Sequence, residues 1–123
     1  MALVEMIIVF NEDKTVFVCP DISSVRTECE TVDVEDGVYR FFDEEGRRLI
    51  PNFTSPVKRS KVIFGIQAVE GGSFELDLDP YDDGSCFDGA LADAVGMETT
   101  ESFRSLTDLA SFVAQNRRKC MPR

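Results

Sequence analysis

The stretch that most constrains the fold of this chain spans residues 61–79 and reads KVIFGIQAVEGGSFELDLD. Its first half, 62–69, is largely apolar at both odd and even positions, which is typical of a strand buried on both faces. Its second half, 74–79, alternates strictly between apolar and acidic residues, which indicates one buried face and one row of carboxylates. The segment 70–72 contains two glycines, which tolerate the positive φ of a tight turn. We therefore predict a hairpin here, with its first strand in the centre of the sheet.

Short apolar runs before this hairpin predict a meander of antiparallel strands with tight connections. We place these strands at residues 3–10, 15–19, 28–34, 38–42 and 47–50. The alternating, acidic run 28–34 suits an edge strand, where charge discourages aggregation. Pro51 is expected to end the last strand, because proline cannot donate a hydrogen bond to a neighbouring strand. Residues 52–60 then form a loop that leads into the central hairpin.

Beyond Asp79 the apolar spacing changes from the period of a strand to that of a helix. Ser85 is a suitable N-cap for a first helix, and Gly96 is a suitable residue to end it. A second helix follows, with an apolar stripe that ends at Val113. Strands first and helices last predict an α+β fold. We expect one domain over residues 1–123, an antiparallel β-meander sheet of about six or seven strands with two C-terminal helices packed on one face.

Phenylalanine should dominate the core, because the 123-residue chain has ten Phe, two Tyr and no Trp. A hydrophobic content of 43% is enough for a folded domain of this length. Phe64 lies on the strand expected to be buried on both faces, and Phe112 lies in the apolar stripe of the second helix. We therefore predict that both rings are buried.

The charge balance restricts the partners of this protein. The chain carries 23 acidic and 13 basic residues, a formal net charge of −10. Such a field repels phosphate backbones and anionic lipids, so direct binding to nucleic acid or membranes is disfavoured. No apolar run approaches the roughly 20 residues of a membrane-spanning helix. A basic protein partner is favoured, although acidity that serves only solubility would give the same balance.

Cysteine and histidine usage excludes several kinds of site. The chain has no His, and its four cysteines, Cys19, Cys29, Cys86 and Cys120, form no CxxC pair. This usage excludes zinc fingers and Cys-His catalysis. The first ten residues also lack the pattern of a secretory signal. We therefore expect reduced thiols in a cytoplasmic protein, although an even number of cysteines also permits two disulfides.

An acidic segment follows the predicted hairpin, and its acids within 77–88 are Asp77, Asp79, Asp82, Asp83 and Asp88. It fails as an EF-hand calcium loop in either register, because the required glycine or the ligand residues are misplaced. Cys86 stands at the start of the first helix, where a thiolate is stabilised, but the neighbouring acids act against ionisation. We therefore predict no metal ion, no cofactor and no catalytic residue.

The acidic residues of the second hairpin strand and of the following segment are the best candidates for a binding surface. Because the alternation in 74–79 places these carboxylates outside the core, they can pair with Lys and Arg in a partner's cleft. Tyr81 and Phe87 would supply anchoring aromatic area. The predicted partner-binding residues are Glu75, Asp77, Asp79, Tyr81, Asp82 and Asp83.

Size, charge and the lack of catalytic motifs indicate a small non-catalytic binding protein. The best-fitting class, by analogy of size and charge, is an immunity or inhibitor protein that occludes a basic cleft of a toxin or nuclease. One alternative is a small enzyme or divalent-metal-binding protein that uses the segment 77–88. Another alternative is an assembly subunit whose acidity serves only solubility.

Overall fold

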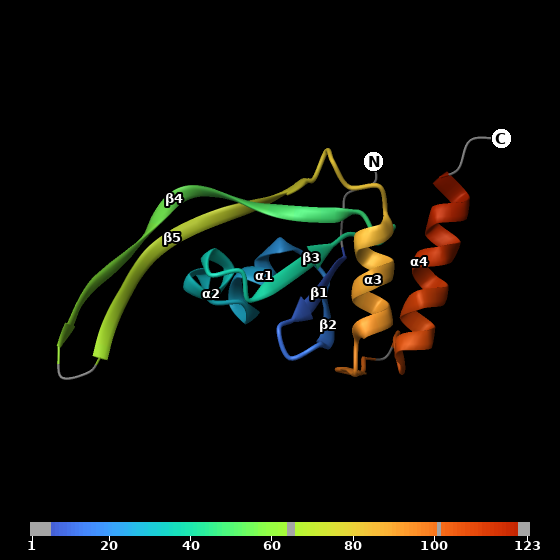
Figure 1. The fold of residues 1–123 in the computed structure, drawn as a ribbon, viewed down its shortest axis with the longest axis horizontal. Helices are drawn as coiled ribbons and strands as arrows, with labels where there is room; N and C mark the ends of the chain where they lie inside the picture. The colour runs from blue at the N-terminus through green and yellow to red at the C-terminus, as the bar shows by residue number, and fades with distance from the viewer. Residues whose placement is uncertain (1–5, 64–65, 101, 121–123) are drawn as a thin grey trace.

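A six-stranded sheet forms the centre of the structure, a computed structural model that describes residues 6–63, 66–100 and 102–120, without the side chains of 56–71 and 120. Its strands are β1 (Ile7–Asn11), β2 (Thr15–Cys19), β3 (Tyr39–Phe42), β4 (Arg48–Ile63), β5 (Ile66–Leu78) and β6 (Gly96–Met97). They lie side by side in the order β5-β4-β3-β1-β2-β6 (Figure 1). Together with the helices, this sheet confirms a mixed α+β fold.

The helices of the described chain are α1 (Ile22–Glu28), α2 (Thr31–Glu35), α3 (Ser85–Asp93) and α4 (Leu106–Cys120). The edge strand predicted at 28–34 is wrong, because α2 and the end of α1 occupy this segment. Val25 and Cys29 are both buried four residues apart, which is helical spacing. Asp21 caps α1 by accepting a hydrogen bond from the backbone N–H of Ser24 at 2.8 Å. No helix among the described residues is long and apolar enough to cross a membrane.

The sheet is mixed, so the prediction of a purely antiparallel meander is wrong in two respects. β2 and β6 run parallel, with Thr15 opposite Gly96. β3 lies beside β1 rather than β2, because β1 pairs with both strands. In each case helices intervene in the chain: α1 and α2 separate β2 from β3, and α3 separates β5 from β6. Such connections let the chain reach a distant edge, which a tight turn cannot do.

The buried core has two parts, one on each face of the sheet, because the side chains of β1 alternate between them. Ile7 and Val9 belong to one cluster, together with buried residues of α1 and α2. Ile8 and Phe10 belong to the other, together with buried residues of α3 and α4. Figure 1 shows α1 and α2 on one side of β1 and β2, and α3 and α4 on the other side. β1 is therefore buried on both faces, a role that the sequence predicts for 62–69.

β4 and β5 form a much longer hairpin than the sequence predicts. β4 runs straight through Pro51, so the predicted strand end and the loop at 52–60 are both wrong. Proline is tolerated because β4 pairs with β3 only as far as Leu49, and no other described strand pairs with that edge of β4. The far part of the hairpin projects well beyond the rest of the molecule (Figure 1).

The turn predicted at 70–72 is also wrong, because these residues lie inside β5. Gly72 does adopt a positive φ of +84°, beside a register shift between Phe53 and Ser55 on the opposite strand. A β-bulge uses the left-handed backbone of glycine as readily as a turn does. Of the two rings predicted to be buried, Phe64 lies outside the described residues. Phe112 is half-buried, and its ring centroid lies 5.2 Å from that of Phe103.

Candidate binding surface at the end of strand β5

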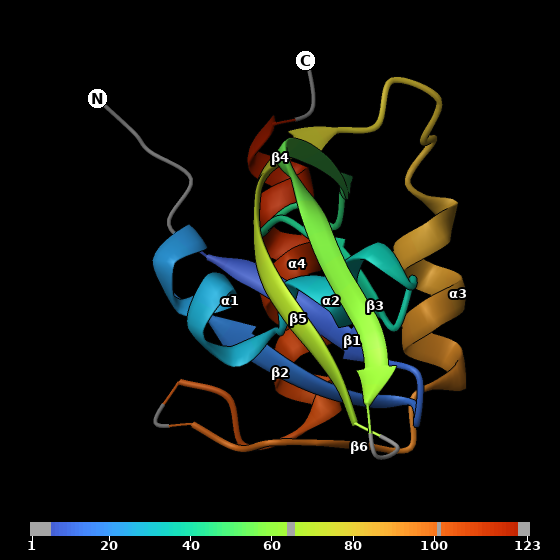
Figure 2. The same cartoon turned by 90° about the vertical axis from the view of Figure 1, so that its left-hand side faces the viewer.

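The chain leaves the sheet at the end of β5 and reaches α3 through residues 79–84, here called the acidic loop (Figure 2). Two of the predicted binding residues, Glu75 and Asp77, lie on β5. The other four, Asp79, Tyr81, Asp82 and Asp83, lie in the acidic loop. These residues are neighbours in space as well as in sequence, but their side chains differ in what they already contact.

Asp82 ties the acidic loop to the start of β4. Its Oδ2 accepts a hydrogen bond from the backbone N–H of Arg48 at 2.7 Å, and its Oδ1 accepts one from Gly84 at 3.0 Å. Partial burial is the largest influence on the pKa of this carboxyl and raises it, but the two backbone hydrogen bonds and one from the thiol of Cys86 act together to lower it. The net pKa of Asp82 is therefore lowered from its ordinary value of 3.8. This carboxylate holds the loop in place and is not free for a partner.

Asp79 and Asp83 also brace the loop from within. The Oδ1 of Asp79 accepts a hydrogen bond from the backbone N–H of Tyr81 at 2.9 Å. Asp83 accepts hydrogen bonds from the hydroxyl of Ser85 at 2.5 Å and from its backbone N–H at 2.9 Å, and these lower the pKa of Asp83. Ser85 was expected to cap α3, whereas it is the first helical residue and Asp83 holds its N–H. Asp83 nevertheless stays exposed and keeps its charge toward solvent.

Glu75 and Asp77 are exposed near the C-terminal end of β5, and both have a partner within the chain. The carboxylate of Glu75 lies 2.6 Å from Nη2 of Arg26 on α1. Asp77 accepts a longer hydrogen bond, 3.2 Å, from the amide of Asn52 on β4. Pairs as exposed as these contribute little to stability and exchange readily with other partners. Asp77 is thus the strand carboxylate most available to a basic group.

The two aromatic residues predicted as anchors have opposite environments. Tyr81 is 93% exposed at the tip of the acidic loop. Phe87 is only 1% exposed, and its ring lies edge-on to the rings of Phe10 and Phe42 in the core. The prediction that Phe87 contacts a partner is wrong, because the first turn of α3 turns this side chain inward. Tyr81 is the one aromatic side chain that the acidic loop offers.

Arg117 of α4 is a residue that the sequence analysis missed as part of this region. Its guanidinium donates to the carbonyl oxygen of Glu45 at 2.8 Å and to that of Gly84 at 3.0 Å, and it lies 2.9 Å from the carboxylate of Asp88. It thereby joins α4, the start of α3 and the turn before β4. Gly46 in that turn has φ +73°, and a Cβ there would lie 2.6 Å from the guanidinium. A basic run at a helix end gives no sign of contacts to turns so distant in sequence.

Two hollows flank Leu78, which is 49% exposed. One is an open hollow of about 780 Å³ between the acidic loop, the start of α3 and the guanidinium groups of Arg47 and Arg117. The other, about 310 Å³, has an apolar floor made by five residues, Ile7, Ile22, Leu49, Leu76 and Leu78. We call the smaller one the apolar hollow; Asp21, Asp43 and Glu75 stand at its edge with Arg47.

Asp43 is a buried carboxylate that the sequence analysis also missed, only 1% exposed. It accepts hydrogen bonds from the backbone N–H groups of Glu45 and Arg47 at 2.9 Å each, and its other oxygen lies 2.7 Å from Nε of Arg47. All of these donors belong to the β3–β4 turn itself. Asp43 is therefore a turn-forming residue with its acceptors used, which explains its burial without a catalytic role.

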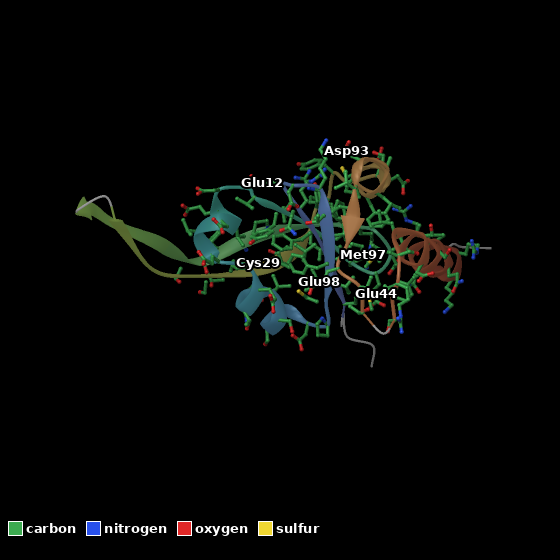
Figure 3. The ribbon with its side chains drawn as sticks, turned by 90° about the horizontal axis from the view of Figure 1, so that it is seen from below. Glu12, Cys29, Glu44, Asp93, Met97 and Glu98 are labelled. Carbon is green, nitrogen blue, oxygen red and sulfur yellow. The ribbon has the colours of Figure 1, made fainter. Side chains whose placement is uncertain are left out.

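The thiols of the described chain are poorly suited to nucleophilic chemistry. A hydrogen bond to the carboxylate of Asp82, followed by burial, raises the pKa of the Cys86 thiol. Burial raises the pKa of Cys19 to about 11 and that of Cys29 to about 12. Cys29 lies in the interior beside α1 (Figure 3). At neutral pH these three thiols are protonated, and a protonated thiol is a weak nucleophile.

The acidic loop lacks the arrangement that a bound cation needs. No group of three or more His, Cys, Asp or Glu side chains within the described parts of the chain could hold a metal ion. The reason is visible in the loop, where the oxygens of Asp79, Asp82 and Asp83 face backbone N–H groups rather than one another.

What the region presents to solvent is an exposed tyrosine between carboxylates, on a loop held in one conformation by its own hydrogen bonds. An exposed aromatic ring beside carboxylates can contact a basic group of another molecule. Comparison of the chain with protein-family models, with curated proteins and with solved structures finds no match in any of the three.

Proposed function

We propose that this chain is a non-catalytic binding protein, of the immunity or inhibitor kind, which occludes a basic cleft of a cytoplasmic protein partner such as a toxin or nuclease. The observation that carries the proposal is Tyr81, 93% exposed on a loop flanked by carboxylates. Tyrosine is enriched at the centres of protein interfaces because it combines a large apolar area with one polar tip.

The braced loop suits this role because little order has to be gained on binding. Asp82 and Arg117 hold the loop to β4 and α4 through backbone groups. A side chain presented on such a pre-ordered backbone loses less conformational entropy when it docks. The sheet with α3 and α4 on one face serves as the rigid support in this proposal.

The electrostatic part of the proposal concerns the rate of association. Asp77 and Asp83 are exposed and flank Tyr81 in the sequence, and the whole chain has a formal net charge of −10. A field of one sign steers a partner of opposite charge and raises its association rate, an effect that salt screens. We therefore expect binding that is fast at low ionic strength and slower by roughly tenfold or more at high ionic strength.

The test compares a site variant with a matched control variant. Tyr81→Ala/Asp77→Lys removes the anchor and reverses one charge in the proposed surface. Val95→Ala/Glu12→Lys makes the same kinds of change elsewhere: Val95 is 71% exposed, and Glu12, labelled in Figure 3, lies in the β1–β2 turn. The proposal predicts that wild type and control capture the same basic protein from native lysate, whereas the site variant does not.

Association kinetics with the captured protein then test the mechanism. The site variant should associate at least about tenfold more slowly, and salt should reduce that difference. Equal capture by both variants would move the interface elsewhere on the molecule. Tight binding of Ca²⁺ or Mg²⁺ by calorimetry, abolished by Asp79→Ala, would instead support the alternative that the segment 77–88 binds a divalent cation.

A further inference from the structure

The far part of the β4–β5 hairpin has no described neighbour on either edge. We call this part, residues 54–63 of β4 and 66–73 of β5, the arm, and the other described residues the body. Its pairing runs from Ser55 opposite Ser73 to Ile63 opposite Ile66. β5 is an edge strand of the sheet, and its neighbour β4 pairs with β3 only near Leu49. Figure 1 shows the arm projecting past α1 and α2 as a ribbon of two strands.

The sequence of the arm is unusual for a ribbon in water. Six of its residues are apolar, Val57, Val62, Ile63, Ile66, Ala68 and Val69, and they occupy both odd and even positions. No strand can turn such a set to one side only, because successive side chains point to opposite faces. An isolated two-stranded hairpin is at best marginally stable in water, so this ribbon calls for a further surface to cover it.

The charges of arm and body are opposite, which favours a second copy of this chain as that surface. Residues 56–71 carry three basic residues, Lys58, Arg59 and Lys61, and one acidic residue. The rest of the chain carries ten basic and twenty-two acidic residues. A basic, apolar ribbon therefore meets its electrostatic complement on the body of another copy.

The body offers a surface of matching chemistry. The apolar hollow has five aliphatic residues on its floor, and two exposed carboxylates, those of Asp21 and Glu75, stand at its edge. Leu78, which lines it, is 49% exposed although it is a large aliphatic residue. The hollow lies where the hairpin joins the body, and the arm of the same chain leads away from it (Figure 1).

We propose that two copies of the chain form a two-fold dimer in which the arm of each lies on the apolar hollow of the other, with its basic residues beside the carboxylates of Asp21 and Glu75. Ten residues of β4 make the arm about 34 Å long, and two strands make it about 10 Å wide. Reciprocal docking covers four such surfaces, about 1,400 Å² in all, which is within the range of specific protein interfaces. The exchange is isologous, so it closes at two copies and does not propagate.

The first experiment measures the mass of the full chain in solution by sedimentation velocity across a concentration series. Wild type should be a dimer at micromolar concentration. Lys58→Glu/Arg59→Glu/Lys61→Glu should weaken the dimer at least about 100-fold, because it removes the charge complementarity. Arg104→Glu/Arg118→Glu/Lys119→Glu reverses three exposed basic residues outside the arm and changes the net charge equally. This control should change the dissociation constant by less than about threefold at moderate salt.

The second experiment tests the exchange itself by complementation. Leu78→Arg places a charge in the apolar hollow at a position already half exposed, so the fold should tolerate it. The arm variant and the Leu78→Arg variant should each be monomeric. Their equimolar mixture should recover part of the dimer, because one chain supplies an intact arm and the other an intact hollow.

Three results would overturn the dimer. A wild-type chain that stays monomeric at about 100 µM, equal weakening by the two triple variants, or a mixture without recovered dimer each contradicts it. A monomeric wild type whose arm binds a nucleic acid duplex would also do so, and would assign the basic residues of the arm to phosphate contacts.

Discussion

The acidic loop and the arm are the two extensions of the sheet, and they are supported in different ways. The acidic loop has no regular secondary structure, yet Asp82, Asp83 and Arg117 hold its backbone from β4, α3 and α4. The arm is regular β-structure, and the support described along its length is the pairing of its own two strands, while α2 also contacts β4 and β5. Regular structure is therefore no measure of support. A loop crossed by long-range hydrogen bonds can be the firmer of the two regions.

The largest loss of stability should come from a substitution in the core that supports both the acidic loop and the arm. Phe10 is 1% exposed and lies edge-on to Phe42 and Phe87 at centroid distances of 5.4 and 5.8 Å. Phe10→Ala should lower the free energy of unfolding by about 3–5 kcal/mol. Urea denaturation followed by circular dichroism measures this change. A loss below about 1 kcal/mol would show that the ring is not packed as described.

Breaking the Arg117 contacts should loosen the acidic loop. Arg117→Ala removes two hydrogen bonds to carbonyl groups and the contact with Asp88. We expect a loss of about 2–3 kcal/mol, because carbonyl groups lose a charged donor. Arg117→Lys should recover little of it, since an ammonium group cannot bridge the separated acceptors as a planar guanidinium does. Hydrogen exchange should be faster in 79–84 in both variants, and full recovery by lysine would contradict this assignment.

Asp82 should make the support of the loop depend on pH. Its pKa is lowered from 3.8 in the folded state, so its contribution to stability is present above pH 3.8 and is lost as pH falls through the folded value. Asp82→Asn should lower the unfolding free energy by about 1–2 kcal/mol at pH 7 and by less at pH 2.5. Chemical denaturation at the two pH values measures this. The same loss at both values would mean that the charge of Asp82 plays no part.

The smallest effect on the body should come from removing the arm. Replacing residues 56–72 by Asn-Gly joins Ser55 to Ser73, which are paired in the sheet, through a two-residue hairpin turn. The body should keep its stability within about 1 kcal/mol, because a shorter connection alters the closure entropy little. Denaturation should be followed at low protein concentration, where association does not add to stability. An unfolded product would show that the arm supports the body after all.

Local signals predicted the elements that depend on nearby residues. The hairpin of β1 and β2 and the helices α3 and α4 follow from alternation or from apolar spacing in their own segments. The prediction of a strand at 28–34 was wrong because the acidic residues and valines that alternate there belong largely to the short helix α2. The glycines at 71–72 misled for a similar reason, since a bulge and a turn require the same positive φ.

The residues of the candidate surface could be predicted from the sequence, but the contacts that hold them in place could not. The sequence identified Tyr81 and the acids around it, and the structure places them together. It could not show that Asp82 binds the backbone of Arg48, thirty-four residues away, or that Arg117 reaches Glu45, seventy-two residues away. These contacts arise when the sheet and α4 assemble, so they leave no periodic pattern in the chain.

The two edges of the sheet differ in their risk of uncontrolled strand addition. β6 covers part of the outer edge of β2, where a strand from another molecule would otherwise pair. The outer edge of β5 has no such cover in the described chain, but it carries Glu75 and Asp77. Charged side chains on an open strand are a recognised protection against edge-to-edge aggregation. We therefore expect the acidic alternation of β5 also to oppose polymerisation of the molecule, and replacing both acids by threonine to remove that protection while leaving the fold intact.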